Sequence, residues 1–278
     1  MLGHRLFADL RHRHDVRATL RQPLEAYHDH RLFDSTSAIA GVDARLTDSL
    51  AEVLAATRPE AVVNCVGIVK QRPSANDAIA SLEINALLPH RLARLCRIAG
   101  ARLIHISTDC VFSGRKGGYL ETDPSDAEDI YGRTKYLGEV AENHCLTLRT
   151  SIVGRELARK TGLLEWFLAQ KGTVSGFSNA IFSGLTTNEL SRVIEGMLVD
   201  HQNASGIFQV SSAPIDKYSL LLLFQKYLSP DTQVVPDARI VIDRSLDSTR
   251  FRNEFGYQPP TWEAMVKELA DQKWATEK

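Results

Sequence analysis

Two short segments, residues 61–66 (AVVNCV) and residues 102–106 (RLIHI), are apolar along most of their length. A strand with one face in water alternates apolar and polar residues, whereas a strand buried on both faces is apolar almost throughout. The two segments therefore indicate central strands of a sheet that is covered on both sides. Residues 16–20 and 146–150 are weaker candidates for further strands.

Helical patterns separate these strands. Apolar residues recur at intervals of three and four in residues 2–10, 48–57, 78–99 and 131–143. Strands that alternate with helices need crossover connections, which make neighbouring strands parallel and place helices on both faces of the sheet. The predicted fold class is therefore α/β, with a doubly wound parallel sheet.

The pattern loosens after about residue 150, where stretches that contain Gly and Ser begin. Helices are expected near residues 187–199, 217–227 and 261–273. We predict a sheet domain over residues 1–150 and a smaller, interleaved domain mainly over residues 151–278, with segments that return to the first domain. The smaller domain would cover the carboxyl ends of the strands, where ligands of such sheets bind.

The composition excludes several classes of protein. A net charge of -1, from 33 Lys and Arg against 34 Asp and Glu, provides no field to recruit nucleic acid or an anionic membrane. The four cysteines stand singly, so neither a metal site nor a disulfide framework is predicted. No apolar run approaches the roughly 18 residues that span a bilayer, and the start of the chain does not read as a signal peptide. We expect a soluble, cytoplasmic protein.

The strongest chemical signal is the segment YGRTKYLGE, which begins at Tyr131 and contains Lys135. A spacing of four residues places the two side chains on one face of a helix, about one turn apart. Because an ammonium group stabilises a nearby phenolate, Lys135 is expected to lower the pKa of Tyr131. Such pairs also occur on ordinary solvated helices, so the interpretation depends on the segment that precedes this one.

That segment is IHISTDCVFSG, residues 104–114, at the expected end of a parallel strand. Together with YGRTK, the later GE and the LRTS of residues 148–151, it resembles the extended short-chain dehydrogenase/reductase superfamily, and within it the dTDP-4-dehydrorhamnose reductase group. The resemblance extends along nearly the whole chain, as far as residues 255–262 (FGYQPPTW). Cys110 stands where these reductases commonly have Tyr.

The resemblance implies a Rossmann-like fold and NADPH-dependent reduction of a 4-keto group on a nucleotide-activated deoxysugar, in polysaccharide biosynthesis. Thr108 would hydrogen-bond the substrate carbonyl, and Tyr131 would supply the proton. Lys135 would hold the nicotinamide ribose and tune Tyr131. The alternative for Thr108 is a hydroxyl that satisfies backbone groups at the end of the strand. The partner is a nucleotide sugar, and formation of a homodimer is left open.

Further cofactor contacts follow from the same resemblance. Residues 64–67 (NCVG) come directly after a buried strand, and Gly67 would let the backbone approach the ribose and phosphates. Asp43 with Ala44 would lie beside the adenine and Asn85 behind the active site, with a surface acid and a buried helical amide as the alternatives. The predicted cofactor-binding residues are Gly3, Arg21, Asp43, Ala44, Cys65, Val66, Gly67, Asn85, Tyr131 and Lys135.

Arg21 bears on the choice of cofactor, because it ends the VRATLR segment that forms the expected second strand of such a domain. An acid at this place would bind the ribose hydroxyls of NAD, whereas a base suits the 2'-phosphate of NADP. NADP(H) is therefore favoured over NAD(H), with a solvent-facing arginine as the alternative.

The substrate region is predicted from residues 176–187 (GFSNAIFSGLTT), which resemble the stretch that contacts the sugar nucleotide in this group. Phe182 and Thr186 are the candidate contacts within it. Lys70 and Arg72 are candidates for the diphosphate, although charges on a loop are also compatible with simple solvation.

The start of the chain enters a helix directly after Met1. The superfamily has a buried first strand and a G-x-x-G-x-x-G turn before this helix, and Gly3 matches the third glycine. We therefore expect an N-terminally truncated chain that lacks the first strand of the sheet. It would also lack the backbone amides that bind the cofactor pyrophosphate, which weakens the cofactor site.

Two other functions remain open. A nucleotide-sugar epimerase or dehydratase would keep NAD bound, but Arg21 and the Ser-Thr-Asp-x-Val-Phe pattern argue against it. The regulatory beta subunit of methionine adenosyltransferase also resembles these reductases and serves as a binding partner. The complete set of Thr108, Tyr131 and Lys135 favours an enzyme over this non-catalytic alternative.

Overall fold

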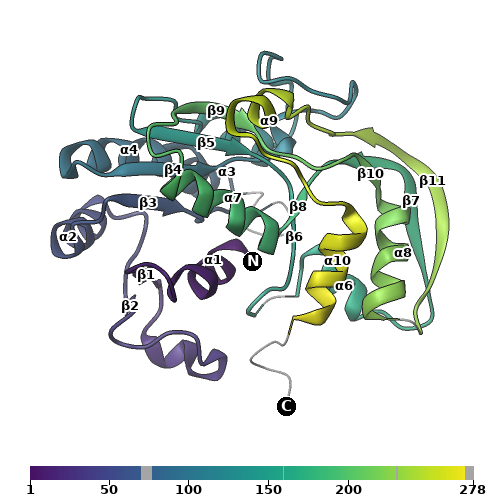
Figure 1. The fold of residues 1–278 in the computed structure, drawn as a ribbon, viewed down its shortest axis with the longest axis horizontal. Coiled ribbons are helices and arrows are strands. Elements are labelled where there is room, and N and C mark those ends of the chain that lie inside the picture. The colour runs from purple at the N-terminus through teal and green to yellow at the C-terminus, as the bar shows by residue number, and fades with distance from the viewer. Residues whose placement is uncertain (70–76, 159, 230, 273–278) are drawn as a thin grey trace.

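A computed structural model of the chain describes residues 1–69, 77–158, 160–229 and 231–272 (Figure 1). Its main sheet has four parallel strands in the order β3-β4-β5-β9. These strands are β3 (Ala61–Asn64), β4 (Arg102–Ile106), β5 (Cys145–Arg149) and β9 (Gly206–Gln209). The predicted α/β class with a parallel sheet is confirmed, and β4 has the predicted bounds.

Helices cover both faces of this sheet, as the apolar character of its strands predicts. Leu103 and Cys145 pack on one side with α2 (Thr47–Thr57) and α4 (Leu88–Ala99). Ile104, Leu146 and Leu148 pack on the other side with α1 (Leu2–Leu10) and α7 (Thr187–Val199). Because successive side chains of a strand point to opposite faces, each strand contributes to both layers of the core.

A separate two-stranded parallel sheet contains β1 (Ala18–Thr19) and β2 (Ala38–Ile39), which follow α1 and the 3-10 helix η1 (Leu24–His30). The strand expected at residues 16–20 is thus present but shorter. Within the part of the chain that the structure describes, this sheet does not pair with β3, so β3 is an edge strand. The backbone groups on that edge face the cavity described below.

The later part of the chain forms a third sheet of order β10-β7-β11, with β10 antiparallel and β11 parallel to β7. Its strands are β10 (Ile215–Asp216), β7 (Thr173–Phe182) and β11 (Gln233–Asp243), while β6 (Ile152–Val153) pairs with β8 (Leu185–Thr186). The helices here are α6 (Leu163–Leu168), α8 (Lys217–Leu228), α9 (Thr249–Phe255) and α10 (Trp262–Asp271). The division at residue 150 stays a prediction, and β9 is a later segment that adds a strand to the main sheet.

Two predicted helices differ substantially from the observed bounds, while others differ by one or two residues. The helix expected at residues 78–99 consists of α3 (Ala78–Ser81), a π-helical turn η3 (Leu82–Leu87) and α4. The helix expected at residues 131–143 is the shorter α5 (Ile130–Leu137). Its C-cap is Gly138, where a Cβ would overlap the Asn85 carbonyl oxygen, so glycine lets the end of α5 lie directly against η3. None of the helices described is long and apolar enough to cross a membrane.

Candidate functional site

The residues predicted to be catalytic lie after the carboxyl end of β4. Thr108 caps the short 3-10 helix η4 (Asp109–Val111), and its hydroxyl accepts a hydrogen bond from the Cys110 amide at 3.1 Å. Tyr131 lies in the first turn of α5, which Asp129 caps by accepting a hydrogen bond from Gly132 at 2.7 Å. A Cβ at Gly132 would overlap the Cys110 carbonyl oxygen, so glycine lets α5 begin directly against the loop that carries Thr108.

The electrostatic environment of Tyr131 differs from the one expected from the sequence. Burial raises the pKa of Tyr131, and the hydrogen bond of the Thr108 hydroxyl opposes the rise only in part. The expectation that Lys135 lowers this pKa is therefore wrong for this structure. The physical reason is that the loss of hydration disfavours the phenolate, while the Lys135 ammonium is directed to the Ile106 carbonyl at 2.6 Å.

Lys135 lies in a buried polar network. Its Nζ is also 3.5 Å from Nε2 of His105, a fully buried residue of β4. Burial lowers the pKa of Lys135 to about 8, while the nearby Glu139 carboxylate favours the charged form and limits the decrease. Lys135 can therefore change its charge near neutral pH, which is an unusual property for a lysine.

Glu139 belongs to a buried ion pair below this network. Arg149, the last residue of β5, donates two hydrogen bonds to the carboxylate, at 2.8 and 2.7 Å. Ser107 donates a third at 2.8 Å. The exposed fractions of the two charged side chains are 4% for Arg149 and 3% for Glu139, so water does not screen the pair. The pair connects β5, the end of β4 and the residues just after α5.

Three charged residues near Thr108 did not stand out in the sequence. Asp109 is buried, and burial raises its pKa, while the charges of Lys217 and Arg244 oppose the rise. The Lys217 ammonium lies 3.8 Å from the centre of the Phe182 ring and makes no hydrogen bond or ion pair with any described residue. Two sequence features could have pointed to them. Asp109 belongs to the STD run, and Lys217 stands at the start of a predicted helix. A cation without a hydrogen-bonding partner among the described residues is thus placed beside the Thr108 loop, where a polar ligand could use it.

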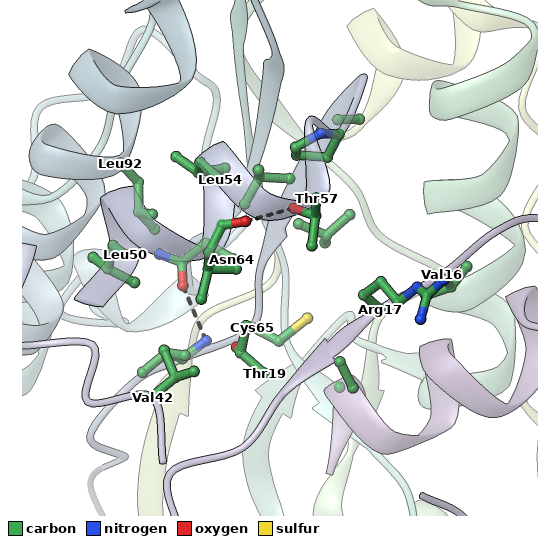
Figure 2. Close-up of a pocket in the computed structure, with 18 of the residues that line it drawn as sticks. Val16, Arg17, Thr19, Val42, Leu50, Leu54, Thr57, Asn64, Cys65 and Leu92 are labelled. Carbon is green, nitrogen blue, oxygen red and sulfur yellow. Dashed lines mark hydrogen bonds between the residues drawn. The ribbon is translucent and has the colours of Figure 1, made fainter. Parts of the chain in front are cut away.

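A cavity of about 2380 Å³ lies between β1 and β3. Figure 2 shows Leu50, Leu54 and Leu92 on one side of it and Thr19 of β1 on another. Such a volume exceeds the roughly 300–1,000 Å³ of ordinary ligand pockets, so a dinucleotide has ample room. Apart from Asn85 and the pair Tyr131 and Lys135, the predicted cofactor-binding residues all line it, namely Gly3, Arg21, Asp43, Ala44, Cys65, Val66 and Gly67.

The polar groups of this cavity fit the adenosine half of a dinucleotide in part. The Arg21 side chain is exposed, makes no hydrogen bond or ion pair with any described residue, and is free to meet a phosphate. The Asp43 carboxylate instead accepts hydrogen bonds from the Arg45 side chain and amide, at about 3.0 Å each, and these lower the pKa of Asp43 to about 2. Asp43 would have to exchange this partner in order to bind a ribose hydroxyl.

The other predicted residues occupy different places. Asn85 does not line the cavity, because its amide binds both backbone groups of Ile68, at 2.9 and 3.0 Å. Thr186 is fully buried and caps α7, and Phe182 packs against Trp262 with a ring-centre distance of 5.3 Å. Their substrate contacts stay predictions, as do those of Lys70 and Arg72, which lie outside the described residues.

The described residues contain no cluster of three or more His, Cys, Asp or Glu side chains that could hold a metal ion. The cysteines are free thiols at positions 65, 96, 110 and 145. Burial raises the pKa of Cys65 and that of Cys110 to about 12, so both thiols stay protonated and unreactive at neutral pH. The hydroxyl groups of Thr108 and Tyr131 and the nearby amines are the candidate reactive groups of the site.

Comparisons with known proteins identify the family of the chain. A family model described as the RmlD substrate binding domain matches residues 1–169. A dTDP-4-dehydrorhamnose reductase from Mycobacterium tuberculosis is 36% identical over 101 residues, which cover 34% of this chain and 33% of that protein. The same-named protein of Escherichia coli is 26% identical over 257 residues, covering 82% and 85%. The match to the mycobacterial relative thus spans about a third of its length.

Solved structures share the fold. The crystal structure of a dTDP-4-dehydrorhamnose reductase from Bacillus anthracis, in complex with NADP, superposes with a TM-score of 0.74. The superposition covers 91% of this chain and 98% of that one, at 19% sequence identity. At this level of sequence identity, the superposition shows that the two proteins share a fold.

Proposed function

The chain belongs to the RmlD substrate binding domain family, and from this premise we propose that it is an NADPH-dependent reductase of a keto group on a nucleotide-activated deoxysugar. The observation that carries the proposal is the hydrogen bond between the Thr108 and Tyr131 side chains, with the buried Lys135 one turn further along α5. The names of the M. tuberculosis and E. coli relatives support the substrate class. In this proposal the cofactor binds to residues 1–150, and residues 151–278 mainly hold the substrate.

A nicotinamide dinucleotide, when bound, would supply the hydride. The chain's own residues would receive the charge that develops on the carbonyl oxygen. Thr108 would donate a hydrogen bond to this oxygen, and Tyr131 would transfer its phenolic proton to it. The phenol of Tyr131 is protonated at neutral pH, as a proton donor in the reductive direction must be, and burial, which raises its pKa, favours this form further. Lys135 would hold the nicotinamide ribose.

The decisive experiment measures oxidation of NADPH with a panel of keto-sugar nucleotides. We expect turnover with at least one 4-keto deoxysugar nucleotide, and the product is identified by mass spectrometry. Binding of NADPH and of the sugar nucleotide without turnover of any member of the panel would contradict the proposal and favour the non-catalytic alternative.

Arg21 is expected to select the cofactor. In Arg21→Asp a carboxylate would repel the 2'-phosphate of NADPH and could accept hydrogen bonds from the ribose hydroxyls of NADH. We expect the ratio of NADPH to NADH affinity to fall by about tenfold or more, the scale of one lost charge-assisted hydrogen bond. Cofactor titrations measure it. Lys171→Asp makes the same change of charge at an exposed site and should leave the ratio unchanged.

Lys217 is expected to bind the sugar nucleotide, because its ammonium has no hydrogen-bonding partner among the described residues and lies beside the Thr108 loop. Lys217→Met should raise KM for the sugar nucleotide by about tenfold or more, again the scale of one charge-assisted hydrogen bond, while Lys217→Arg retains part of the affinity. Steady-state kinetics separate KM from kcat. Lys226→Met, an exposed site on the same helix, serves as the control, and an equal KM for both methionine variants would contradict the assignment.

A further inference from the structure

His105 lies between two polar side chains in the core of the main sheet and is not used by the mechanism described above. Its Nδ1 is 3.1 Å from Nδ2 of Asn64, and its Nε2 is 3.5 Å from Nζ of Lys135. His105 is 0% exposed and Asn64 is 3% exposed, so water does not compete for these contacts. Burial, together with the charge of Lys135, keeps the pKa of His105 well below its usual value, and the ring is therefore neutral.

The orientation of Asn64 follows from a backbone contact. The amide N–H of Val66 donates a hydrogen bond to Oδ1 of Asn64 at 3.1 Å. A backbone N–H can only donate, so the oxygen of the Asn64 amide must be the atom that faces Val66. The NH₂ group of Asn64 then faces His105 and donates to Nδ1. Since Nδ1 accepts, the single proton of the neutral ring is on Nε2.

This proton faces Lys135. An ammonium group has three donors and no lone pair, so it cannot accept a hydrogen bond from the Nε2–H of His105. A neutral amine has one lone pair and can accept it, while still donating to the Ile106 carbonyl at 2.6 Å. The imidazole therefore favours the neutral form of Lys135 over the charged form. The effect is strong in a dry environment, where electrostatic interactions are least screened.

We propose that His105, oriented by Asn64 and the Val66 amide, is a positioning residue that sets the charge state of Lys135 by directing its Nε2–H at the lysine Nζ. The effect of His105 on Lys135 does not depend on the proposed function. Only its consequence for catalysis rests on that function: the charge of Lys135, one turn from Tyr131 on α5, would change within the working pH range.

The other groups near Lys135 have opposite effects, and none of them replaces His105. Glu139, just after α5, favours the ammonium, but its carboxylate is shared with Arg149 and Ser107. Cys65, directly after β3, favours the ammonium less than Glu139 does. Tyr131 lies one turn earlier on α5, and His90 on α4 acts on the His105 ring rather than on the lysine. Burial lowers the pKa of Lys135 to about 8, and the Nε2–H of His105 acts in the same direction.

The first test needs no substitution. Nitrogen-15 NMR of the His105 ring distinguishes the Nε2–H tautomer from the Nδ1–H tautomer, and the lysine ε-carbon signal of Lys135 reports its titration directly. We expect the Nε2–H tautomer and a Lys135 pKa near 8 in the wild-type chain. The Nδ1–H tautomer would overturn the proposal. Neither signal depends on turnover, so this result is independent of whether the reductase assignment is correct.

The second test reverses the tautomer with an isosteric change. In Asn64→Asp one carboxylate oxygen accepts from the Val66 amide and the other accepts from Nδ1–H of His105, so Nε2 becomes an acceptor that faces Lys135. The expected result is the Nδ1–H tautomer and a rise of the Lys135 pKa by about one unit or more. If the enzyme turns over, the corresponding limb of the pH–rate profile should move by the same amount.

A double variant separates this pathway from a direct effect of the new charge. In the His105→Phe background, Asn64→Asp should raise the Lys135 pKa by less than half as much, because no imidazole connects the two positions. Equal shifts in both backgrounds would mean that the carboxylate acts through space and would refute the role of His105. His144→Gln is the matched control, because His144 binds the Ala93 carbonyl at 2.8 Å and should leave the titration of Lys135 unmoved.

Discussion

Tyr131→Phe should lower kcat by about two to four orders of magnitude, the usual loss when a positioned proton donor is removed. The phenolic oxygen is the only atom removed, and the ring keeps its packing at the start of α5. Cofactor affinity and the thermal unfolding temperature should therefore change little. Steady-state kinetics, a cofactor titration and a thermal melt on the same preparation measure the three quantities.

Tyr136→Phe is the control, since Tyr136 lies on the same helix and is 45% exposed. It makes the same chemical change outside the site and should keep the wild-type rate. A Tyr131→Phe rate within threefold of the wild type would contradict the role of Tyr131 as proton donor, whatever the identity of the substrate.

Glu139→Gln should destabilise the protein by about 3–5 kcal/mol, because it leaves the buried Arg149 guanidinium without a counter-charge. Arg149 loses both charged acceptor oxygens, at 2.8 and 2.7 Å, and the low exposure of the pair prevents water from replacing them. Chemical denaturation, monitored by circular dichroism, measures the change in the free energy of unfolding.

The exposed pair Lys226 and Glu263 provides the comparison. Their side chains are 59% and 54% exposed, so Glu263→Gln should cost at most about 1 kcal/mol. If the two variants destabilised the protein equally, the buried pair would have no special role in connecting β5 to the residues after α5. A cost of Glu139→Gln below about 1 kcal/mol would have the same meaning.

Much of the fold was predictable because it depends on residues that are near one another in the chain. The apolar run of β4 and the periodicity of α1 and α7 predicted those elements at their observed bounds. The errors occur where tertiary contacts override the local pattern. The helix α5 ends at Leu137, before Gly138, a helix-end signal that the periodicity of residues 131–143 hid, and Gly138 packs against the Asn85 carbonyl.

The candidate site was predictable only in part. The sequence alone identified three candidate residues, Thr108, Tyr131 and Lys135. It also gave the spacing of four that places the last two on one face of α5. The position of Lys217 beside the Thr108 loop does not follow from the sequence, because the two residues lie far apart in the chain. The same holds for Asn64 and His105, which are 41 residues apart and meet only because β3 and β4 are neighbours in the sheet.

The sequence by itself thus determined several strands and helices of the main sheet domain and the candidate hydroxyl groups, because these depend on apolar periodicity and on local spacing. Only the tertiary structure decided the charge states. The pKa of Tyr131 is raised rather than lowered, and that of Lys135 falls to about 8, because burial removes hydration from both groups. The degree of burial, and the partner that each polar atom finds, are set by segments distant in the chain, and a local pattern carries no information about them.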